Sequence, residues 1–582
     1  MTTRHHGEER SMLDSRVPHR TRQLTRVRAA ATSGTLVTMA VAGIIAVSTS
    51  CAPARQEAST GGTYDDLLAL FDEWRAFESP KFVEGVPDYS ARAMAAQRTA
   101  LAGWQARLDD FDVQGWPVAQ QIDWHLVRAE MNGLEFDHRV RRPWERDPAF
   151  YVTIYPAQSD VPAHEGPVIH GWIDLWLYDY PLSAEDAAEL AERIGATPRI
   201  LEQARVNLTG NARDLWLASL RSFRGQVADL ESLGERVGGT SAELDAAIVA
   251  AREATEAFVG WLEEEAPSKT GPSGVGKDEY TWYMQNVHLV AFSWEEQVTL
   301  MRRELARAHS SLRLEEHRNR DLPELERIGD ADEYDRRLND AVARYMEFLD
   351  EEGIHTIEEW MDPALRAQMG SFTPAGPDEL RSFFQEVNYR DPMVLLTHKH
   401  HWIELAYIRE KPHPSSIRSA PPLYNIYDNR SEGLATGIEE MMMHAGLYDG
   451  FPRSRELVWI MLAQRAARAL AGLYLHGHEF TMEEAVEFAG RWTPRGWLPD
   501  ADLVRGEQQL YLRQPGYGTS YVTGKIQLEE LIAEVALERG DAFTVGSFFD
   551  DYFRAGVIPH TLVRWEMSGW KDPILMVGGG ND

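Results

Sequence analysis

Three histidines and one glutamate provide the clearest chemistry in the sequence. His398, His400 and His401 lie within four consecutive residues, and Glu432 opens a predicted helical run farther along the chain. On a helix, His398 and His401 share a face because they lie three residues apart. Two imidazoles and a carboxylate commonly hold hydrolytic zinc and leave a fourth position for water. We therefore predict that His398, His401 and Glu432 bind zinc or another divalent metal, with His400 as the alternative histidine.

A hydrolytic metal site also needs a general base, and the usual source of that base is missing. The motif His-Glu-x-x-His, whose glutamate activates the metal-bound water, does not occur in this chain. Glu404 lies four residues after His400, and Glu440 lies four residues before His444. Each of these acids can reach an imidazole on its own helix, so either one is predicted as the base of a rearranged site. The alternative is a polar helix face that lines a cleft without metal.

A segment near the C-terminus combines glycine, proline and aromatic residues. It runs from Arg513 to Lys525 between two helical stretches. Loops of this composition bring phenols and backbone N–H groups close to ligands. We predict that Tyr521 stabilises an oxyanion and that Lys525 binds a carboxylate. The alternative is a turn in which Tyr517 and Tyr521 only pack.

The first fifty residues have the pattern of a lipoprotein signal. Seven arginines precede the apolar run Thr35–Val47, and three small residues lead into Cys51, the single cysteine. The apolar run is shorter than the roughly 20 residues that span a bilayer. We predict a signal peptide over 1–50 and a lipid on Cys51, which anchors the protein in the cell envelope outside the cytoplasm. An uncleaved anchor or a plain secretory signal is the alternative.

Composition limits the classes of partner. With Cys51 lipidated, no thiol remains for a disulfide, so the apolar core must stabilise the fold. The formal net charge is −32, which repels phosphate backbones. Nucleic-acid binding is therefore not expected. A peptide or small-molecule substrate is compatible with this charge, and the membrane is contacted through the N-terminal lipid.

The sequence pattern predicts helices over nearly the whole chain. Helix starts are predicted at Ser183, Ser241, Ser293 and Thr481, and the last two are each followed three residues later by a glutamate, which makes a capping box. Strand signals are restricted to 150–155 and, more weakly, 519–522. The predicted fold class is predominantly α, a large helical scaffold with a cleft and at most one small β-sheet.

Two breaks divide the helical pattern. The turn-rich segment 268–276 separates a predicted N-terminal helical region, 64–270, from a C-terminal region, 271–582, and residues 51–63 form the lipidated cysteine and a tether. A second break, 411–430, contains four prolines and lies between the histidine cluster and Glu432.

The order of these landmarks resembles bacterial domain of unknown function family 885, whose members are secreted or lipid-anchored and related to helical zinc metallopeptidases. The similarity extends from about residue 64 to the C-terminus. It is carried by the segments 180–183, 274–280, 432–435, 475–476 and 515–525.

Family members with a complete site have His-Glu-x-x-Pro-Gly-His-His and, later, Glu-Gly-Trp-Ala. Here Val394 and Leu395 stand where the metal-binding histidine and the catalytic glutamate are expected, and Leu434 replaces the tryptophan. The resemblance implies a metallopeptidase-like scaffold with Glu432 as a metal ligand. Two functions follow as expectations: a metal-dependent hydrolase of peptides or related amides, or a catalytically inactive lipoprotein that binds a peptide or glycan without metal.

Overall fold

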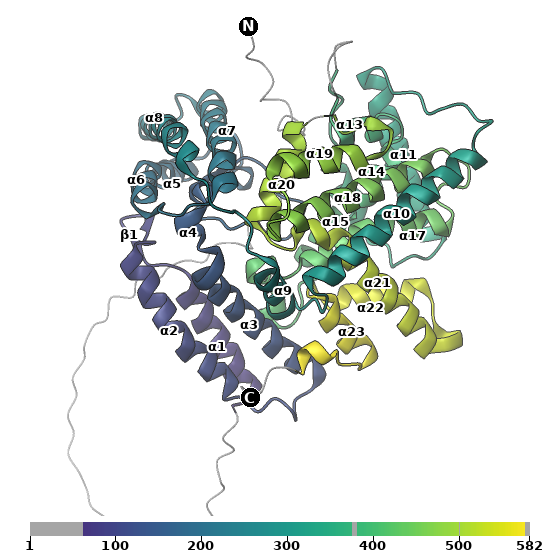
Figure 1. The fold of residues 1–582 in the computed structure, drawn as a ribbon, viewed down its shortest axis with the longest axis horizontal. Coiled ribbons are helices and arrows are strands. Elements are labelled where there is room, and N and C mark those ends of the chain that lie inside the picture. Colours follow the sequence, from purple (N-terminus) through teal and green to yellow (C-terminus); the bar gives the residue numbers. More distant parts are fainter. Residues whose placement is uncertain (1–61, 375–380, 500, 577–582) are drawn as a thin grey trace, which may run out of the picture.

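The computed structural model describes residues 62–374, 381–499 and 501–576. The predicted signal peptide, the lipidated Cys51 and nearly all of the tether lie outside the described residues. The prediction of a predominantly α protein is confirmed (Figure 1). None of the described helices has the length and apolar character that crossing a membrane requires.

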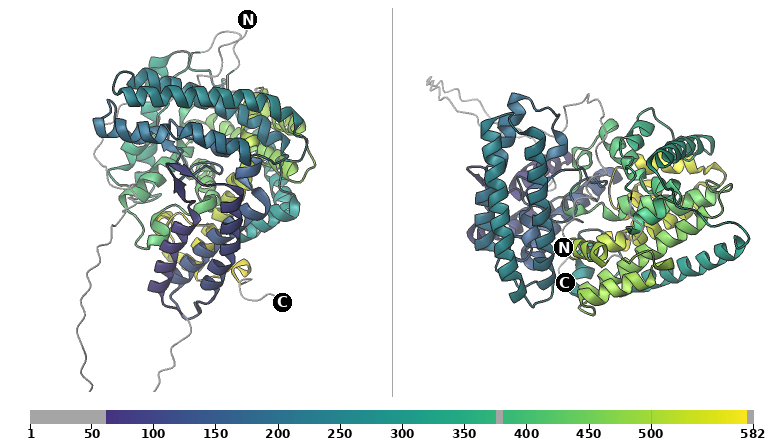
Figure 2. Two further views of the ribbon diagram at one scale, coloured as in Figure 1. Left: turned by 90° about the vertical axis from the view of Figure 1, so that its left-hand side faces the viewer. Right: turned by 90° about the horizontal axis from the view of Figure 1, so that it is seen from above.

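The N-terminal part of the chain forms two groups of helices. The first group is α1 (Tyr64–Glu78), α2 (Ala91–Asp109), α3 (Val118–Phe136) and α4 (Pro143–Arg146). The second group is α5 (Ala184–Ile194), α6 (Thr197–Asn207), α7 (Arg213–Val237) and α8 (Ala242–Glu265). The long helices α7 and α8 lie side by side at one edge of the molecule (Figure 2).

The remaining helices build the larger, C-terminal part. The first of them are α9 (Lys277–Asn286), α10 (Trp294–Arg318), α11 (Ala331–Glu351), α12 (Met361–Arg366), α13 (Phe383–Asn388), α14 (Pro392–His398), α15 (His400–Glu410) and α16 (Ser416–Ser419). They are followed by α17 (Asp428–Ala445), α18 (Ser454–His476), α19 (Met482–Trp492), α20 (Ala501–Arg513), α21 (Tyr517–Arg539), α22 (Val545–Arg554) and α23 (His560–Ser568).

Local sequence signals explain where several helices begin. Ser183, Ser241, Ser293 and Thr481 each accept a hydrogen bond from a backbone N–H of the first turn, as predicted. Both predicted capping boxes are present, because Glu296 and Glu484 reach back to the N-cap backbone.

The described residues contain two small sheets, whereas at most one was predicted. β1 (Phe82–Val83) pairs antiparallel with β2 (Val86–Pro87), and β3 (Ile154–Tyr155) pairs parallel with β4 (Ile173–Asp174). Only the end of the predicted strand 150–155 is extended, because Pro148–Tyr151 form a 3-10 turn. The weaker strand prediction, 519–522, is wrong, because these residues belong to α21 and pack into the helical core. Helical contacts outweigh their β propensity.

One large apolar core joins the two parts of the chain. It contains side chains from α1 through α23, and a smaller second core lies among β3, α5, α7 and α8. Residues on both sides of the predicted boundary at residue 270 contribute to the large core. The division at that position stays a prediction.

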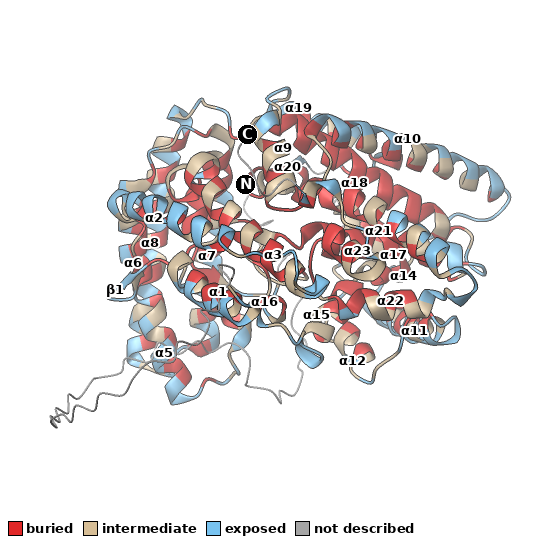
Figure 3. Cartoon of the chain, turned by 90° about the horizontal axis from the view of Figure 1, so that it is seen from below, coloured by how far each residue is buried: buried red, intermediate tan, exposed pale blue. Residues whose placement is uncertain are grey.

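The centre of the C-terminal part is a close crossing of two helices. α17 packs along α21, and both are buried over much of their length (Figure 3). At the crossing, a Cβ on Gly433 would lie 2.4 Å from the carbonyl carbon of Gly524, and a Cβ on Gly524 would lie 1.9 Å from the carbonyl oxygen of Asn429. The two backbones therefore touch, and only glycine fits at either position.

We expect Gly524→Ala to destabilise the fold severely, by about 3 kcal/mol or more, because α17 and α21 would have to separate. Gly260→Ala is the matched control, since Gly260 lies inside α8 with open space around its Cα. The control should gain up to about 1 kcal/mol from helix propensity. Urea denaturation measures both changes, and equal stability of the two variants would contradict the packing described here.

Buried neutral histidines predict a loss of stability in mild acid. Burial lowers the pKa of His125 and His288 to about 3 and that of His138 and His476 to about 4. The unfolded chain binds protons below its histidine pKa of about 6.5, whereas the folded chain does not. Stability is therefore complete above about pH 6.5 and falls as the pH drops toward these folded values.

His288 is suited to a test because neither ring nitrogen has a hydrogen-bond partner among the described residues. At about pH 5 its share of the loss is about 2 kcal/mol. Between about pH 7.5 and pH 5, the unfolding free energy of the wild type should fall by about 2 kcal/mol more than that of His288→Phe. Urea denaturation at the two pH values measures both changes. The same decrease in the variant and the wild type would show that His288 does not contribute.

Candidate functional site

The histidine cluster lies at a break between two helices. His398 is the last residue of α14, and His401 lies in the first turn of α15. The prediction of one continuous helix is therefore incorrect at Lys399, which ends α14 and precedes α15. The break still leaves the two imidazoles together, because their ring centroids are 5.0 Å apart and their planes are perpendicular.

Glu432 of α17 completes a group of three possible ligands. Its Oε2 lies 3.2 Å from Nε2 of His401 and 3.8 Å from Nε2 of His398. The ligand atoms of all three residues lie within 4.8 Å of one another. Ligands on a tetrahedral zinc ion, with bonds of about 2.0–2.1 Å, stand about 3.3 Å apart. The donor types and spacings therefore fit a small divalent cation.

A buried carboxylate orients His398. Oε1 of Glu439 lies 3.1 Å from Nδ1 of His398, and Arg465 donates to both oxygens of Glu439 at 2.6 and 2.8 Å. Glu439 favours the tautomer that carries its proton on Nδ1, which leaves the Nε2 lone pair directed at the cluster, whereas Nη2 of Arg465, 3.1 Å from the same Nδ1, can only donate to it. Metal-binding histidines commonly have such a carboxylate partner.

Glu432 and His401 form a buried ion pair. Burial alone would raise the pKa of Glu432, but the charge and hydrogen bond of His401 outweigh it and lower that pKa to about 2. Burial would likewise lower the pKa of His401, but Glu432 outweighs it and raises that pKa to about 9.

The other oxygen of Glu432 is connected through Tyr517 to Glu165, an acid that the sequence analysis did not identify. The hydroxyl of Tyr517 lies 2.6 Å from Oε1 of Glu432 and 2.6 Å from Oε1 of Glu165. Burial, together with the nearby Asp160, raises the pKa of Glu165 to about 7. A phenol has one proton, so it donates to ionised Glu432 while Glu165, when protonated, donates to the phenol oxygen. Glu165, Tyr517 and Glu432 thus form a hydrogen-bonded chain.

His400 faces away from the other two histidines. Its Nδ1 lies 3.2 Å from the hydroxyl of Tyr345, and its ring stacks on Phe553. Burial drives its pKa well below the usual value, so the ring is neutral. His400 is not part of the three-ligand group in the described residues.

The two acids predicted as bases are both held by cations. Glu404 is ion-paired with Arg430 and accepts a hydrogen bond from Ser431 at 2.8 Å. Glu440 accepts two hydrogen bonds from Arg307, at 2.6 and 2.7 Å. His444 lies 3.4 Å from Glu440, within the predicted reach.

The two predicted residues of α21 lie one helical turn apart and have different partners. The ring of Tyr521 lies parallel to that of His398, with centroids 6.3 Å apart. Lys525 lies 3.0 Å from Glu440 and also pairs with Glu529. The carboxylates that Lys525 contacts are therefore the protein's own.

Sequence reasoning missed four residues around the cluster: Glu165, Glu439, Arg465 and Tyr517. Glu439 follows Glu432 by two helical turns, so helical spacing could have placed it on the same face. Glu165 gives no such signal, because it lies in the long connection between β3 and β4 and reaches the cluster only through tertiary folding.

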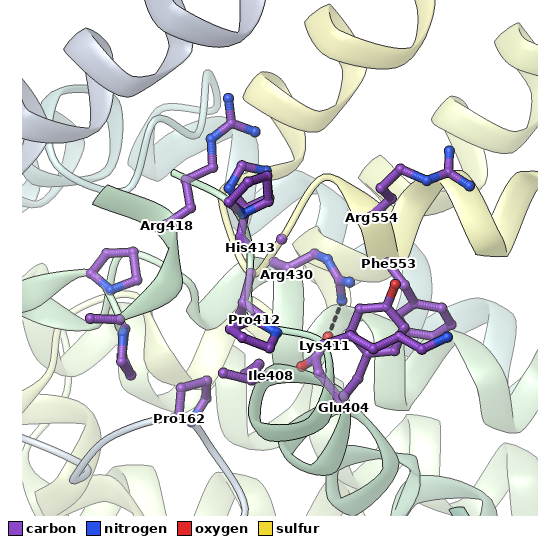
Figure 4. Close-up of a pocket in the computed structure, with 17 residues that line it drawn as sticks. Pro162, Glu404, Ile408, Lys411, Pro412, His413, Arg418, Arg430, Phe553 and Arg554 are labelled. Carbon is purple, nitrogen blue, oxygen red and sulfur yellow. Dashed lines mark hydrogen bonds and ion pairs between the residues drawn. The ribbon is translucent and has the colours of Figure 1, made fainter. Parts of the chain in front are cut away.

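A cavity of about 230 Å³ lies against α15 and the start of α17, the helices that carry His401 and Glu432, and Figure 4 shows the residues that line it. Its wall includes Glu404, Tyr407 and Ile408 of α15, and Arg430 of α17. The proline-rich break predicted over 411–430 forms another part of the wall. A second cavity, of about 180 Å³, lies against α3 and the connection that carries Glu165, and it shares Pro421 and Pro422 with the first.

Comparison with known proteins indicates the family and the fold. The family described as "Bacterial protein of unknown function (DUF885)" matches residues 80–382 and 400–567. No curated protein matches the sequence.

Two similar solved structures are each described as a "putative lipoprotein". The one from Shewanella oneidensis, of unknown function, is 15% identical, with a TM-score of 0.64 over 87% of this chain and 100% of that chain. The one from Colwellia psychrerythraea is 14% identical, with a TM-score of 0.62 over 87% of this chain and 99% of that chain. At these identities the likeness shows a shared fold. Since the family match covers most of the sequence, the chain belongs to the DUF885 family of bacterial proteins of unknown function.

Proposed function

We propose that the protein is a lipid-anchored hydrolase of the cell envelope that uses zinc or another divalent metal to cleave peptides or related amides. The observation that carries the proposal is the group formed by His398, His401 and Glu432, whose ligand atoms lie within 4.8 Å of one another. Glu439 supports it by orienting His398. The names given to the two similar structures, together with the sequence around Cys51, support the lipid anchor.

A metal at this site would polarise the scissile carbonyl and lower the pKa of bound water. Among the acids near the cluster, Glu165 is the best general base, because a pKa of about 7 lets it take up a proton near neutral pH. Glu404 and Glu440 are weaker candidates, because each already forms an ion pair with an arginine. Tyr521, whose ring stacks with that of His398, would donate a hydrogen bond to a developing oxyanion.

The absence of the His-Glu half of the zinc motif favours a second candidate function, a catalytically inactive lipoprotein that binds a peptide or glycan. Val394 is fully buried, so the position of the missing histidine belongs to the apolar core. His401 and Glu432 also satisfy each other as an ion pair. Such a pair requires no metal, and this candidate predicts none.

Metal content distinguishes the two functions. We expect the chain from residue 52 onward, which retains every described residue, to bind near-stoichiometric zinc or another divalent ion, measured by elemental mass spectrometry after dialysis. His401→Ala and Glu432→Ala should each abolish this binding by removing a ligand. His444→Ala is the matched control, because this histidine lies on α17 with an exposed side chain and should leave the metal bound. Absence of metal from the wild-type protein would favour the inactive binding protein.

Glu165→Gln tests the general base. The substitution preserves shape and removes the proton acceptor, so turnover should fall by roughly 100-fold or more. Metal content should stay unchanged, because Glu165 is not in the ligand group. Amine release from a panel of short peptides measures turnover. Glu404→Gln and Glu440→Gln are measured in parallel. If one of them loses turnover but keeps its metal, and Glu165→Gln stays active, the base is that residue and not Glu165.

A further inference from the structure

The cavity against α15 and α17 has an unusual charge for this protein. Four of its side chains are cationic, and one is a carboxylate, Glu404. Lys411 and Arg554, labelled in Figure 4, have side chains 44% and 69% exposed, so we call their side of the cavity the opening. Arg418 and Arg430 are buried, and we call their side the base. The whole chain has a formal net charge of −32. A cationic cavity on an acidic protein selects for an anion that approaches this opening.

The base of the cavity already binds a carboxylate. Arg430 pairs with Glu404, and Ser431 donates to the other oxygen of the same group. Nε of Arg430 is buried and has no hydrogen-bond partner among the described residues. Arg430 is fully buried, so its Nε has no surface exposed to the cavity and its charge is already compensated by Glu404. Arg418 is likewise already paired, with Asp123 and Glu566.

The cations at the opening are available to a ligand. Lys411 pairs with Glu358, and Arg554 pairs with Asp551, but these pairs are solvent-exposed. Exposed ion pairs contribute little free energy, so a carboxylate that enters the cavity can recruit both cations at small cost.

The walls suit a short, partly apolar chain end. Tyr407, Ile408 and Phe553 supply apolar surface, and the remaining wall is rich in proline, at Pro162, Pro412, Pro414, Pro421 and Pro422. Proline has a fixed backbone torsion, which keeps such a wall rigid. The volume is below the roughly 300–1,000 Å³ of pockets that enclose whole drug-sized ligands. The cavity therefore fits the end of a ligand.

Helix α15 sets the spacing between the cavity and the cluster. It carries His401 at one end and Tyr407 in the cavity wall six residues later, a rise of about 9 Å. This is the length of about three extended residues. His401 and Glu432 are buried and do not line the cavity, so a peptide held there brings a bond near its C-terminal end to the cluster only if the side chains between them move.

We propose that this cavity binds the terminal carboxylate of the substrate, so that the protein acts on short peptides or acylated amino acids with a free C-terminus. This substrate class rests on the function proposed above. The carboxylate is held by Lys411 and Arg554 at the opening. Binding of the carboxylate in the cavity does not require the metal ligands.

The test compares N-acetyl-Ala-Ala with its C-terminal amide by isothermal titration calorimetry, on the purified chain from residue 52 onward. A third ligand, N-acetyl-Ala-Glu diamide, carries its carboxylate on a side chain. We expect the terminal carboxylate to bind about tenfold more tightly than the amide. The double variant Lys411→Gln/Arg554→Gln should reduce that preference to less than twofold. Equal affinity of acid and amide, or a preference for the side-chain carboxylate, would overturn the proposal.

Arg409→Gln/Arg539→Gln is the matched control. It also removes two positive charges, one on α15 near Lys411 and one that pairs with Asp551, and neither lines the cavity. It should retain the preference, and an equal loss in this control would overturn the proposal. His401→Ala should also retain the preference, whether or not the wild type holds metal, so failure of the proposed hydrolase would be seen separately in metal content. A preference lost in His401→Ala but kept in the cavity variant would place the carboxylate at the cluster and refute the assignment.

Discussion

The site depends on the contact between Gly433 of α17 and Gly524 of α21. With no side chain at either position, the two backbones touch and neighbouring residues come together in fixed positions. Glu432, immediately before Gly433, meets Tyr517 of α21, and Glu440 meets Lys525, immediately after Gly524. A larger residue at the crossing would separate these pairs. The close approach therefore positions the acidic residues of α17 as well as supporting the core.

Charge compensation distinguishes Glu432 from the other buried acids of the site. Glu404 is paired with Arg430, Glu439 with Arg465, and Glu440 with Arg307 and Lys525. Within the described residues, Glu432 contacts only imidazoles and the hydroxyl of Tyr517. Imidazoles can lose their charge and coordinate an ion, whereas guanidinium groups cannot. This difference explains why Glu432 suits a ligand role, and why the other three acids suit support of the fold.

The sequence predicted the local features well and the long-range ones poorly. The capped helix starts and the helical fold class follow from residue types at helical spacing, and both are present. The pairing of His398 with His401 also follows from spacing, whereas the approach of Glu432 was predicted from its ligand chemistry and from the family resemblance. The break at Lys399 was missed because either helical continuation or a break suits that polar segment. Glu165 and the cavity were missed for another reason: distant segments meet there, and no sequence spacing records such a meeting.

The change in the zinc motif limits which part of the fold could supply a general base. In the complete motif, the glutamate that serves as base lies on the same helix as the histidine ligands. In this chain Val394 is buried in the core and Leu395 is partly buried against it, so the body of α14 contributes apolar contacts instead of a ligand and a base. Both histidines of the group lie at the end of α14 and the start of α15, and neither helix supplies an unpaired acid beside them. If the protein is the hydrolase proposed above, its base would come from outside these helices, and Glu165, linked to Glu432 through Tyr517, meets that requirement.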